Sequence, residues 1–253
     1  MQYHHTTNRN FEDFASGRVF YALPGQPAFP VRLASEIFQR CLLYWQKMGG
    51  TGLCTLYDPT CGGAYWLAVL AYLHWNRIAA IFASDMDAEV LALAKRNFAL
   101  LTARGLGQRI TEIKEMFIAY GKESHAGALE SANRFKLQLQ NHLKSHAIQT
   151  HVFQADGTES QAIQWGIGGS KIDIVLSDVP YGVHSSWQET ADPGHENPVW
   201  KMLDALRPVL PPEAVIAIAA DKRQKIQHDG YRRLERFQVG KRRIVVFRKA
   251  DSQ

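Results

Sequence analysis

Four short apolar segments of this chain are each followed by an aspartate, and this recurrence is the strongest constraint on its fold. The segments are residues 53–57, 78–84, 150–154 and 172–177. Each has the length and the β-branched or aromatic content of a buried strand. They predict an α/β fold with a mostly parallel sheet, in which ligands bind at the carboxyl ends of the strands. One acidic strand end is weak evidence of a site, but four of them together favour one.

The first strand leads into a glycine loop and then a helix. Residues 58–64 read Asp-Pro-Thr-Cys-Gly-Gly-Ala, and the apolar run 65–73 follows. Gly62 and Gly63 permit close backbone approach, and a helix start offers free N–H groups. The Gly-x-Gly-x-x-Gly spacing of a dinucleotide site is absent. Asp58 would repel a diphosphate but attract a positively charged amino group. S-adenosylmethionine carries such a group and no phosphate.

Carboxylates after the next two strands extend this expected site. Asp85 follows the second strand, where a carboxylate is placed to accept hydrogen bonds from both ribose hydroxyls of an adenosine. Asp156 follows the third strand, where it would accept from an adenine amino group. Asp87 is expected instead to cap the helix behind it, because apolar residues repeat there at helical spacing.

The fourth strand ends in a turn that places a carboxylate beside an aromatic ring. The turn reads Asp178-Val179-Pro180-Tyr181-Gly182. An acceptor carboxylate next to a flat ring suits a planar, nitrogen-bearing target such as a nucleobase. A proline turn of purely structural purpose explains the motif alone equally well. The glycine loop upstream favours the functional interpretation.

Basic residues are concentrated near the end of the chain. Residues 221–249 contain 11 Lys or Arg and 3 Asp or Glu, whereas the remainder has 18 basic and 21 acidic residues. The run is either a solvated strand edge or a surface that contacts RNA phosphates. The expected phosphate-contacting residues are Lys222, Arg223, Lys225, Arg232, Arg233, Lys241, Arg242 and Arg243.

Together these motifs resemble those of the class I, Rossmann-like methyltransferases. The Asp/Asn-Pro-Pro-Tyr turn belongs to the branch of that group that methylates nucleobase nitrogens. The resemblance is closer still to the avilamycin/evernimicin-resistance ribosomal RNA methyltransferases, the AviRa-like family. The segments that carry it are residues 24–34, 36–40, 58–67, 84–87, 178–182 and 214–217.

The chain departs from the general pattern at two positions. Val179 stands where most relatives have proline, but the AviRa type accepts an aliphatic residue there. Ala64 replaces the last glycine of the cofactor loop. Its methyl group narrows the loop, so an effect on cofactor affinity is expected.

The resemblance implies S-adenosylmethionine as cofactor and a guanine of large-subunit ribosomal RNA as target, with resistance to orthosomycin antibiotics. The implied catalytic residues are those of the turn, Asp178, Val179, Pro180 and Tyr181. Asp178 would act as general base for N1, the main-chain carbonyl of Val179 would help to position the base edge, and Tyr181 would stack on the base. The motif alone allows the exocyclic N2 equally well. The implied cofactor-binding residues are Asp58, Pro59, Cys61, Gly62, Gly63, Tyr65, Asp85, Met86 and Asp156. Arg32 and Trp187 join the expected RNA-binding residues.

The expected organisation is a single methyltransferase domain spanning residues 1–253. Residues 1–50 form an N-terminal extension with a helix over about 32–46, and 104–147 form a helical insertion of two amphipathic helices. Gly121 and Gly127 are expected to flank the break between them. The insertion is a lid, an RNA-facing arm or a packing hairpin. From residue 214 the chain is expected to form a strand and an antiparallel hairpin, which completes seven strands.

Cysteine spacing and hydropathy indicate an intracellular protein. Cys41, Cys54 and Cys61 form no paired spacing, which argues against a disulfide framework or a metal site. The longest apolar run, residues 64–73, is too short to span a bilayer. A cytoplasmic monomer without metal or membrane association is expected.

The sequence alone leaves three other functions open. A similar turn occurs in enzymes that methylate DNA adenine or a glutamine side chain, although the basic end disfavours both. An RNA-binding module with a defunct cofactor site is the second, with Ala64 as the suspicious residue. A nicotinamide oxidoreductase is the third, and the missing glycine spacing weakens it.

Overall fold

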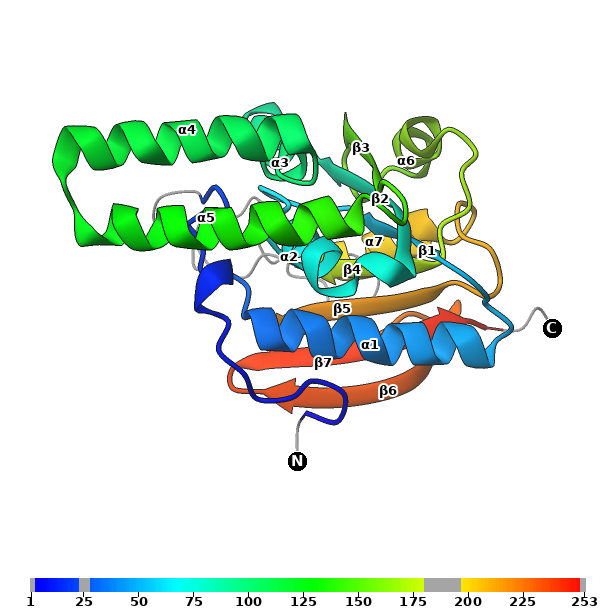
Figure 1. The fold of residues 1–253 in the computed structure, drawn as a ribbon. Coiled ribbons are helices and arrows are strands. Elements are labelled where there is room, and N and C mark those ends of the chain that lie inside the picture. Colours follow the sequence, from blue (N-terminus) through cyan, green and yellow to red (C-terminus); the bar gives the residue numbers. More distant parts are fainter. Residues whose placement is uncertain (1–2, 23–27, 180–196, 251–253) are drawn as a thin grey trace.

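The centre of the molecule is a seven-stranded sheet in the order β3-β2-β1-β4-β5-β7-β6 (Figure 1). The computed structural model describes residues 3–22, 28–179 and 197–250, and the strand count refers to these. Neighbours from β3 through β5 pair in parallel, and β7 pairs antiparallel with both β5 and β6. The predicted fold class, including the antiparallel C-terminal hairpin, is confirmed. The strands are β1 Cys54–Asp58, β2 Ile78–Asp85, β3 Gln149–Gln154, β4 Ile174–Asp178, β5 Val215–Asp221, β6 Tyr231–Val239 and β7 Arg242–Lys249.

Helices cover both faces of the sheet and enclose two apolar cores. On one face lie α1 (Val31–Lys47), α2 (Tyr65–His74) and α3 (Ala88–Ala99), and on the other α6 (Ser160–Ile167) and α7 (Pro198–Leu206). The central strands β1, β4 and β5 are buried on both faces, which is why they read as nearly continuous apolar runs. Two short 3-10 helices are also present: η1 (Glu12–Phe14) precedes α1, and η2 (Trp75–Arg77) connects α2 to β2. None of the helices in the described part of the chain is both long and apolar enough to cross a bilayer.

The predicted insertion forms an antiparallel hairpin of α4 (Ala103–Tyr120) and α5 (Glu123–His142), which projects past the sheet (Figure 1). Its inner part packs on the body of the protein. The ring of Phe135 lies 5.0 Å from that of Phe14, 5.4 Å from Phe20 and 4.8 Å from Tyr72. At the far end Ile118 is 84% exposed, so packing accounts for the inner part only.

One glycine of this hairpin was assigned wrongly from the sequence. Gly121, at φ +60°, does end α4, but Gly127 lies inside α5 and does not flank the break. Its role is close packing. A Cβ at Gly127 would stand 2.8 Å from the Arg18 guanidinium, and the Gly127 carbonyl accepts a hydrogen bond from the same group at 3.0 Å.

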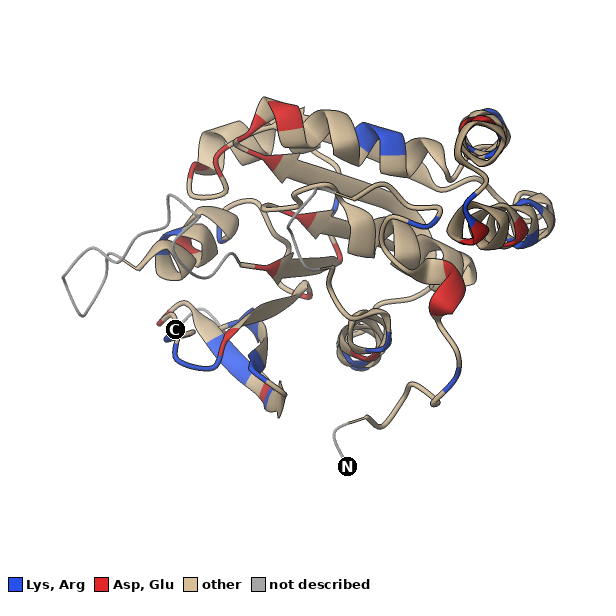
Figure 2. Ribbon diagram, turned by 90° about the vertical axis from the view of Figure 1, so that its left-hand side faces the viewer, with Lys and Arg blue, Asp and Glu red and all other residues tan. Residues whose placement is uncertain are grey.

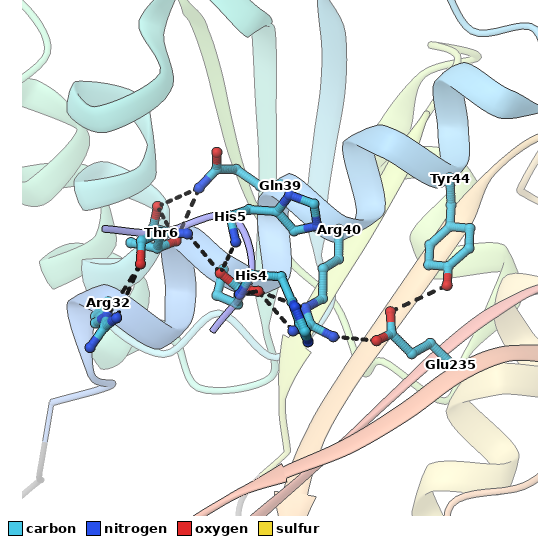
Figure 3. Close-up of polar contacts among 10 residues, drawn as sticks. His4, His5, Thr6, Arg32, Gln39, Arg40, Tyr44 and Glu235 are labelled. Carbon is cyan, nitrogen blue, oxygen red and sulfur yellow. Dashed lines mark hydrogen bonds and ion pairs between the residues drawn. The ribbon is translucent and has the colours of Figure 1, made fainter. Parts of the chain in front are cut away.

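The N-terminal segment is fastened to α1 through a buried carboxylate (Figure 3). Glu36 is fully buried and accepts hydrogen bonds from the backbone N–H groups of residues 4–6 at 2.7–2.9 Å. Arg40, one turn further along α1, donates to Glu36 and also pairs with Glu235 on β6. Tyr44 donates to the same Glu235 carboxylate at 3.3 Å. Because the buried Glu36 carboxylate accepts hydrogen bonds from three backbone N–H groups and is paired with Arg40, its burial does not incur the free-energy penalty of an unpaired ion.

Candidate functional site

The carboxyl ends of β2, β1 and β4 bring three of the predicted carboxylates to one edge of the sheet. The three strands are parallel neighbours, so Asp85, Asp58 and Asp178 end adjacent strands. The pKa of Asp58 is raised mainly by burial, and the charges of Asp85 and Asp178 act in the same direction. Figure 2 shows acidic positions at neighbouring strand ends and basic positions gathered on the C-terminal hairpin.

Asp58 is a buried carboxyl whose two oxygens are both used inside the protein. Its Oδ1 accepts from the Thr60 N–H at 3.0 Å, and its Oδ2 accepts from the Trp66 indole N–H at 2.8 Å. Burial raises its pKa to about 7, although these hydrogen bonds act in the opposite direction. A cation placed beside this carboxyl would favour the ionised form.

Asp85 shapes the glycine loop from the neighbouring strand. Its Oδ2 accepts from the Gly62 N–H at 3.0 Å, and its Oδ1 accepts from the Asp87 N–H at 3.1 Å. Gly62 has φ +50°, a left-handed conformation that glycine adopts without steric cost. Asp87 caps α3 through the Glu89 N–H, as predicted.

Ala64 adopts an unusual backbone conformation at the start of α2. Its φ of +52° makes it the one non-glycine residue with positive φ in the described ranges. The left-handed conformation costs an L-residue about 1–2 kcal/mol. The departure noted in the sequence therefore falls where a glycine would be unstrained. Strain of this kind is often held at functional sites.

Other predicted cofactor-binding residues line the same loop in different ways. Cys61 is buried, and burial raises the pKa of its thiol well above the usual value, so it is not a reactive thiolate. Gly63 packs closely against α3, since a Cβ at this position would lie 2.7 Å from the Leu93 side chain, which would have to shift. Tyr65 donates to the Phe14 carbonyl at 2.6 Å, which ties the loop to η1.

Three further predicted residues border this loop. Pro59 lies next to Asp58, and its carbonyl accepts from the Ser84 hydroxyl at 3.5 Å. Met86 is 52% exposed just after β2. Asp156 follows β3, and one of its oxygens accepts from both the N–H and the hydroxyl of Thr158 at 2.8 Å.

Asp178 differs from these carboxylates because it accepts no hydrogen bond from the described residues. Its Oδ1 is buried, and its one ion pair there is with Arg242 of β7, whose Nε lies 3.8 Å away. Burial raises its pKa to about 6, and Arg242 opposes that shift. Val179 is buried, and its N–H donates to the Ala219 carbonyl. Pro180, Tyr181 and Trp187, also expected in the site, lie outside the described residues.

Trp66 and Ser177 belong to this edge, although neither was predicted from the sequence. Trp66 donates to Asp58, and the Ser177 hydroxyl lies 2.7 Å from that of Thr60, which joins β4 to the glycine loop. Trp66 stands in an apolar run that indicates only a buried helix. No sequence signal marks either contact, because both depend on how the strands and the loop pack.

The residues of the predicted basic surface differ in how far they are exposed. Six of its residues are exposed, in the turns and on the edge strand β6: Lys222, Arg223, Lys225, Arg232, Arg233 and Lys241. Arg242 and Arg243 are only partly exposed, and Arg243 donates to the Gln224 carbonyl at 3.1 Å. Arg32 lies apart from the hairpin, with its guanidinium 4.0 Å from the Tyr3 ring.

The charge of the strand-end cluster fits a cationic cofactor. Among the described residues, none of Asp58, Asp85 and Asp156 forms an ion pair with Lys or Arg. Within that part of the chain, no cationic side chain is therefore paired with these carboxyls to compensate the charge that each carries when ionised, and Asp58, with a pKa of about 7, is only partly ionised at neutral pH. A ligand with a sulfonium and an ammonium group would supply that compensation, whereas a diphosphate would be repelled.

Comparisons with known proteins agree with this arrangement. The family model described as rRNA methyltransferase AviRa matches residues 1–242. A curated relative, the 23S rRNA (guanine(2535)-N(1))-methyltransferase of Streptomyces viridochromogenes, is 38% identical over 250 residues, which cover 98% of this chain and 96% of the relative. Two solved structures of the rRNA methyltransferase aviRa from that organism match with TM-scores of 0.86 and 0.87 at 38% identity, again covering 98% of this chain and 96% of theirs. The chain therefore belongs to the AviRa family of rRNA methyltransferases.

Proposed function

We propose that this enzyme uses S-adenosylmethionine to methylate N1 of a guanine in large-subunit ribosomal RNA, and that the modification confers resistance to orthosomycin antibiotics. The observation that carries the proposal is Asp178, a carboxylate with a free acceptor position that ends the strand beside the cofactor loop. The name of the 38% identical relative supports N1 as the target atom.

The residues proposed to hold the cofactor are those of the glycine loop and the adjacent strand ends. Asp58 and its loop would face the cationic part, Asp85 the ribose hydroxyls, and Asp156 the adenine amino group. When bound, S-adenosylmethionine supplies a methyl group on an activated sulfonium leaving group. The protein's task is then alignment and electrostatics.

The residue proposed to act on the substrate is Asp178. Guanine N1 carries a proton and is a poor nucleophile until that proton leaves. A carboxylate with a pKa of about 6 is ionised at neutral pH and can accept this proton as a general base. The base must first leave its stack, at a cost of a few kcal/mol. Tyr181 is proposed to stack on it, which contributes roughly 1–3 kcal/mol.

We also propose that the chain acts as one domain, with residues 1–50 as an extension and 104–147 as an insertion. The exposed arginines and lysines of the C-terminal hairpin would contact RNA phosphates. The enzyme would act as a monomer in the cytoplasm, where ribosomal RNA is accessible.

The experiment that tests the proposal maps methylation on rRNA from cells with and without the gene. An N1 adduct blocks the pairing edge of guanine, so primer extension should stop at one additional position when the gene is present. Digestion and mass analysis should identify N1-methylguanosine. N2-methylguanosine as the sole product would contradict the N1 assignment while leaving the guanine target intact.

Two controls in vitro test the broader claim. Labelled cofactor incubated with rRNA, DNA and protein fractions should transfer its methyl group to rRNA alone. Calorimetric titration with S-adenosylmethionine should give a binding heat. No heat and no transfer would instead indicate an RNA-binding protein with a defunct cofactor site.

A further inference from the structure

Residues 28–30, just before α1, contribute one buried aromatic ring near the carboxyl ends of the strands. Phe29 is 6% exposed, and its ring centroid lies 4.7 Å from that of Trp66, the residue that donates to Asp58. The guanidinium carbon of Arg242 lies 5.0 Å from the same Phe29 centroid. A line of contacts thus runs from Asp58 through Trp66, Phe29 and Arg242 to Asp178.

The strand register explains how Arg242 reaches a carboxylate two strands away. Ala219 of β5 lies opposite both Asp178 of β4 and Ile244 of β7. Arg242 is two residues from Ile244, so its side chain leaves the same face of the sheet. Because Ala219 ends in a methyl group, the arginine can extend across β5 to the end of β4.

This placement separates Arg242 from the rest of the basic run. Arg232 is exposed on β6 and available to a polyanion, whereas the side chain of Arg242 is 18% exposed. An aromatic ring beneath a guanidinium favours that orientation through a cation–π contact. Sequence alone gives these two arginines the same role.

We infer that Arg242 is a positioning residue of the methylation site: Phe29 holds its guanidinium against Asp178, so that it acts as counter-ion to the general base instead of as a phosphate contact. The inference rests on the proposed function of Asp178.

The charges around Asp178 determine what loss of this counter-ion would do. Arg242 approaches from β7, and Asp58 lies on β1. Asp221 of β5 is opposite Arg242 in register, but its carboxylate is bonded to Arg223. Burial raises the pKa of Asp178 and Arg242 lowers it. Removal of the guanidinium therefore raises this pKa further and leaves less carboxylate at neutral pH.

The test compares Arg242→Met, which keeps an unbranched stem, with Arg242→Lys, which keeps the charge. The carboxyl group of Asp178 is titrated by NMR in protein labelled with ¹³C at aspartate, with Asp178→Asn used to assign the signal. In Arg242→Met its midpoint should rise by about one pH unit, the lower end of what an opposite charge at this range does. Arg242→Lys should restore most of the shift, and Phe29→Leu should move the midpoint in the same direction by less.

Enzyme kinetics and RNA binding supply the second readout. The acid limb of kcat/KM for rRNA methylation should move upward with the NMR midpoint in Arg242→Met, while the salt dependence of RNA binding stays as in the wild type. Arg232→Met, the matched control, should reduce that salt dependence and leave the acid limb in place. Thermal unfolding and cofactor titration check the folding of each variant.

The outcomes separate the role of Arg242 from the proposed function of the enzyme. If Arg242→Met weakens RNA binding as Arg232→Met does and leaves the Asp178 titration unmoved, Arg242 is not the counter-ion. It is equally ruled out if Arg242→Met does not fold and Phe29→Leu, folded, leaves the titration unchanged. If wild-type protein transfers no methyl group to rRNA, the proposed function fails, yet the NMR titration still decides whether Arg242 is the counter-ion.

Discussion

The carboxylates at the edge of the sheet occupy equivalent places in the fold but have different surroundings. Asp58 and Asp85 each accept hydrogen bonds on both oxygens, and these bonds shape the glycine loop. Asp178, at the end of the next strand, accepts none from the described residues and has a single arginine among them beside it. Topology therefore sets where a carboxylate lies, whereas the contacts that each carboxylate makes depend on the residues packed around it.

The largest effect is expected from Asp178→Ala. Loss of a general base lowers the rate by about 10²–10⁴-fold. Cofactor affinity should stay near wild type, because Asp178 accepts no hydrogen bond from the described residues, whereas the unfolding temperature reports the loss of the ion pair with Arg242. Labelled methyl transfer, calorimetry and a thermal scan measure the three quantities. Normal turnover in this variant would show that Asp178 is not the general base, and that it does not differ in role from Asp58 and Asp85.

Asp58→Asn should lower the stability of the glycine loop more than it lowers the rate of methyl transfer. Both oxygens of Asp58 face N–H donors, so one of those donors would meet the new amide NH₂. A buried donor left unpaired costs about 1–3 kcal/mol, which should appear as a lower unfolding temperature and roughly 10-fold weaker cofactor binding. Asp156→Asn is the matched control, since its bonds to Thr158 use one oxygen only. Equal losses in both variants would show that internal bonding does not set the role of these carboxylates.

Cofactor binding should depend on pH through Asp58. The pKa of this carboxyl is raised to about 7, so it is mainly protonated below that pH and mainly ionised above it. The ionised form attracts a cation, hence affinity for S-adenosylmethionine should rise as the pH increases through about 7. Calorimetry on both sides of that pH measures the rise. In Asp58→Asn the dependence should disappear, and a persistent slope would place the titrating group elsewhere.

The smallest effect is expected from Ala64→Gly. Relief of the left-handed strain is offset by the larger freedom of glycine in the unfolded chain, for a net gain on the order of 0.5–1 kcal/mol. The denaturation midpoint should rise, and cofactor affinity should change little. Ala68→Gly, four residues on inside α2, should lower the stability by about 1 kcal/mol or more. A drop in both variants would mean that the Ala64 methyl is needed for packing.

Sequence reasoning succeeded where the signal is local. An apolar run that stops at an aspartate predicted the strand ends, and helical spacing predicted α1, α4 and α5. The cap at Asp87 followed from its place before such spacing. These features depend on residues close together in the chain, so the physics that fixes them is visible in the sequence.

Contacts between distant segments could not be predicted in the same way. The partners Asp58 and Trp66 are eight residues apart, yet only the packed loop brings indole to carboxylate. Arg242 reaches Asp178 because of strand register and because Ala219 is small. The sequence predicts a helix break at Gly127, but the glycine lies inside α5, where the Arg18 side chain packs against it. In each case a second segment decides the role of the residue.

The carboxylate of Glu36 binds the N-terminal segment through its peptide backbone, while the side chain of Arg40 balances its charge. Its partners at residues 4–6 are three successive main-chain N–H groups, so the start of the described chain is bound much as a foreign peptide would be. The side chain of Thr6 adds to the attachment, since its hydroxyl donates to Ser35 at 3.3 Å and accepts from Gln39 at 3.0 Å. A proline at any of the three positions would delete a backbone donor. With one donor fewer, Glu36 would depend more on its ion pair with Arg40. Arg40 would then be less available to Glu235, and the attachment of β6 to α1 would weaken.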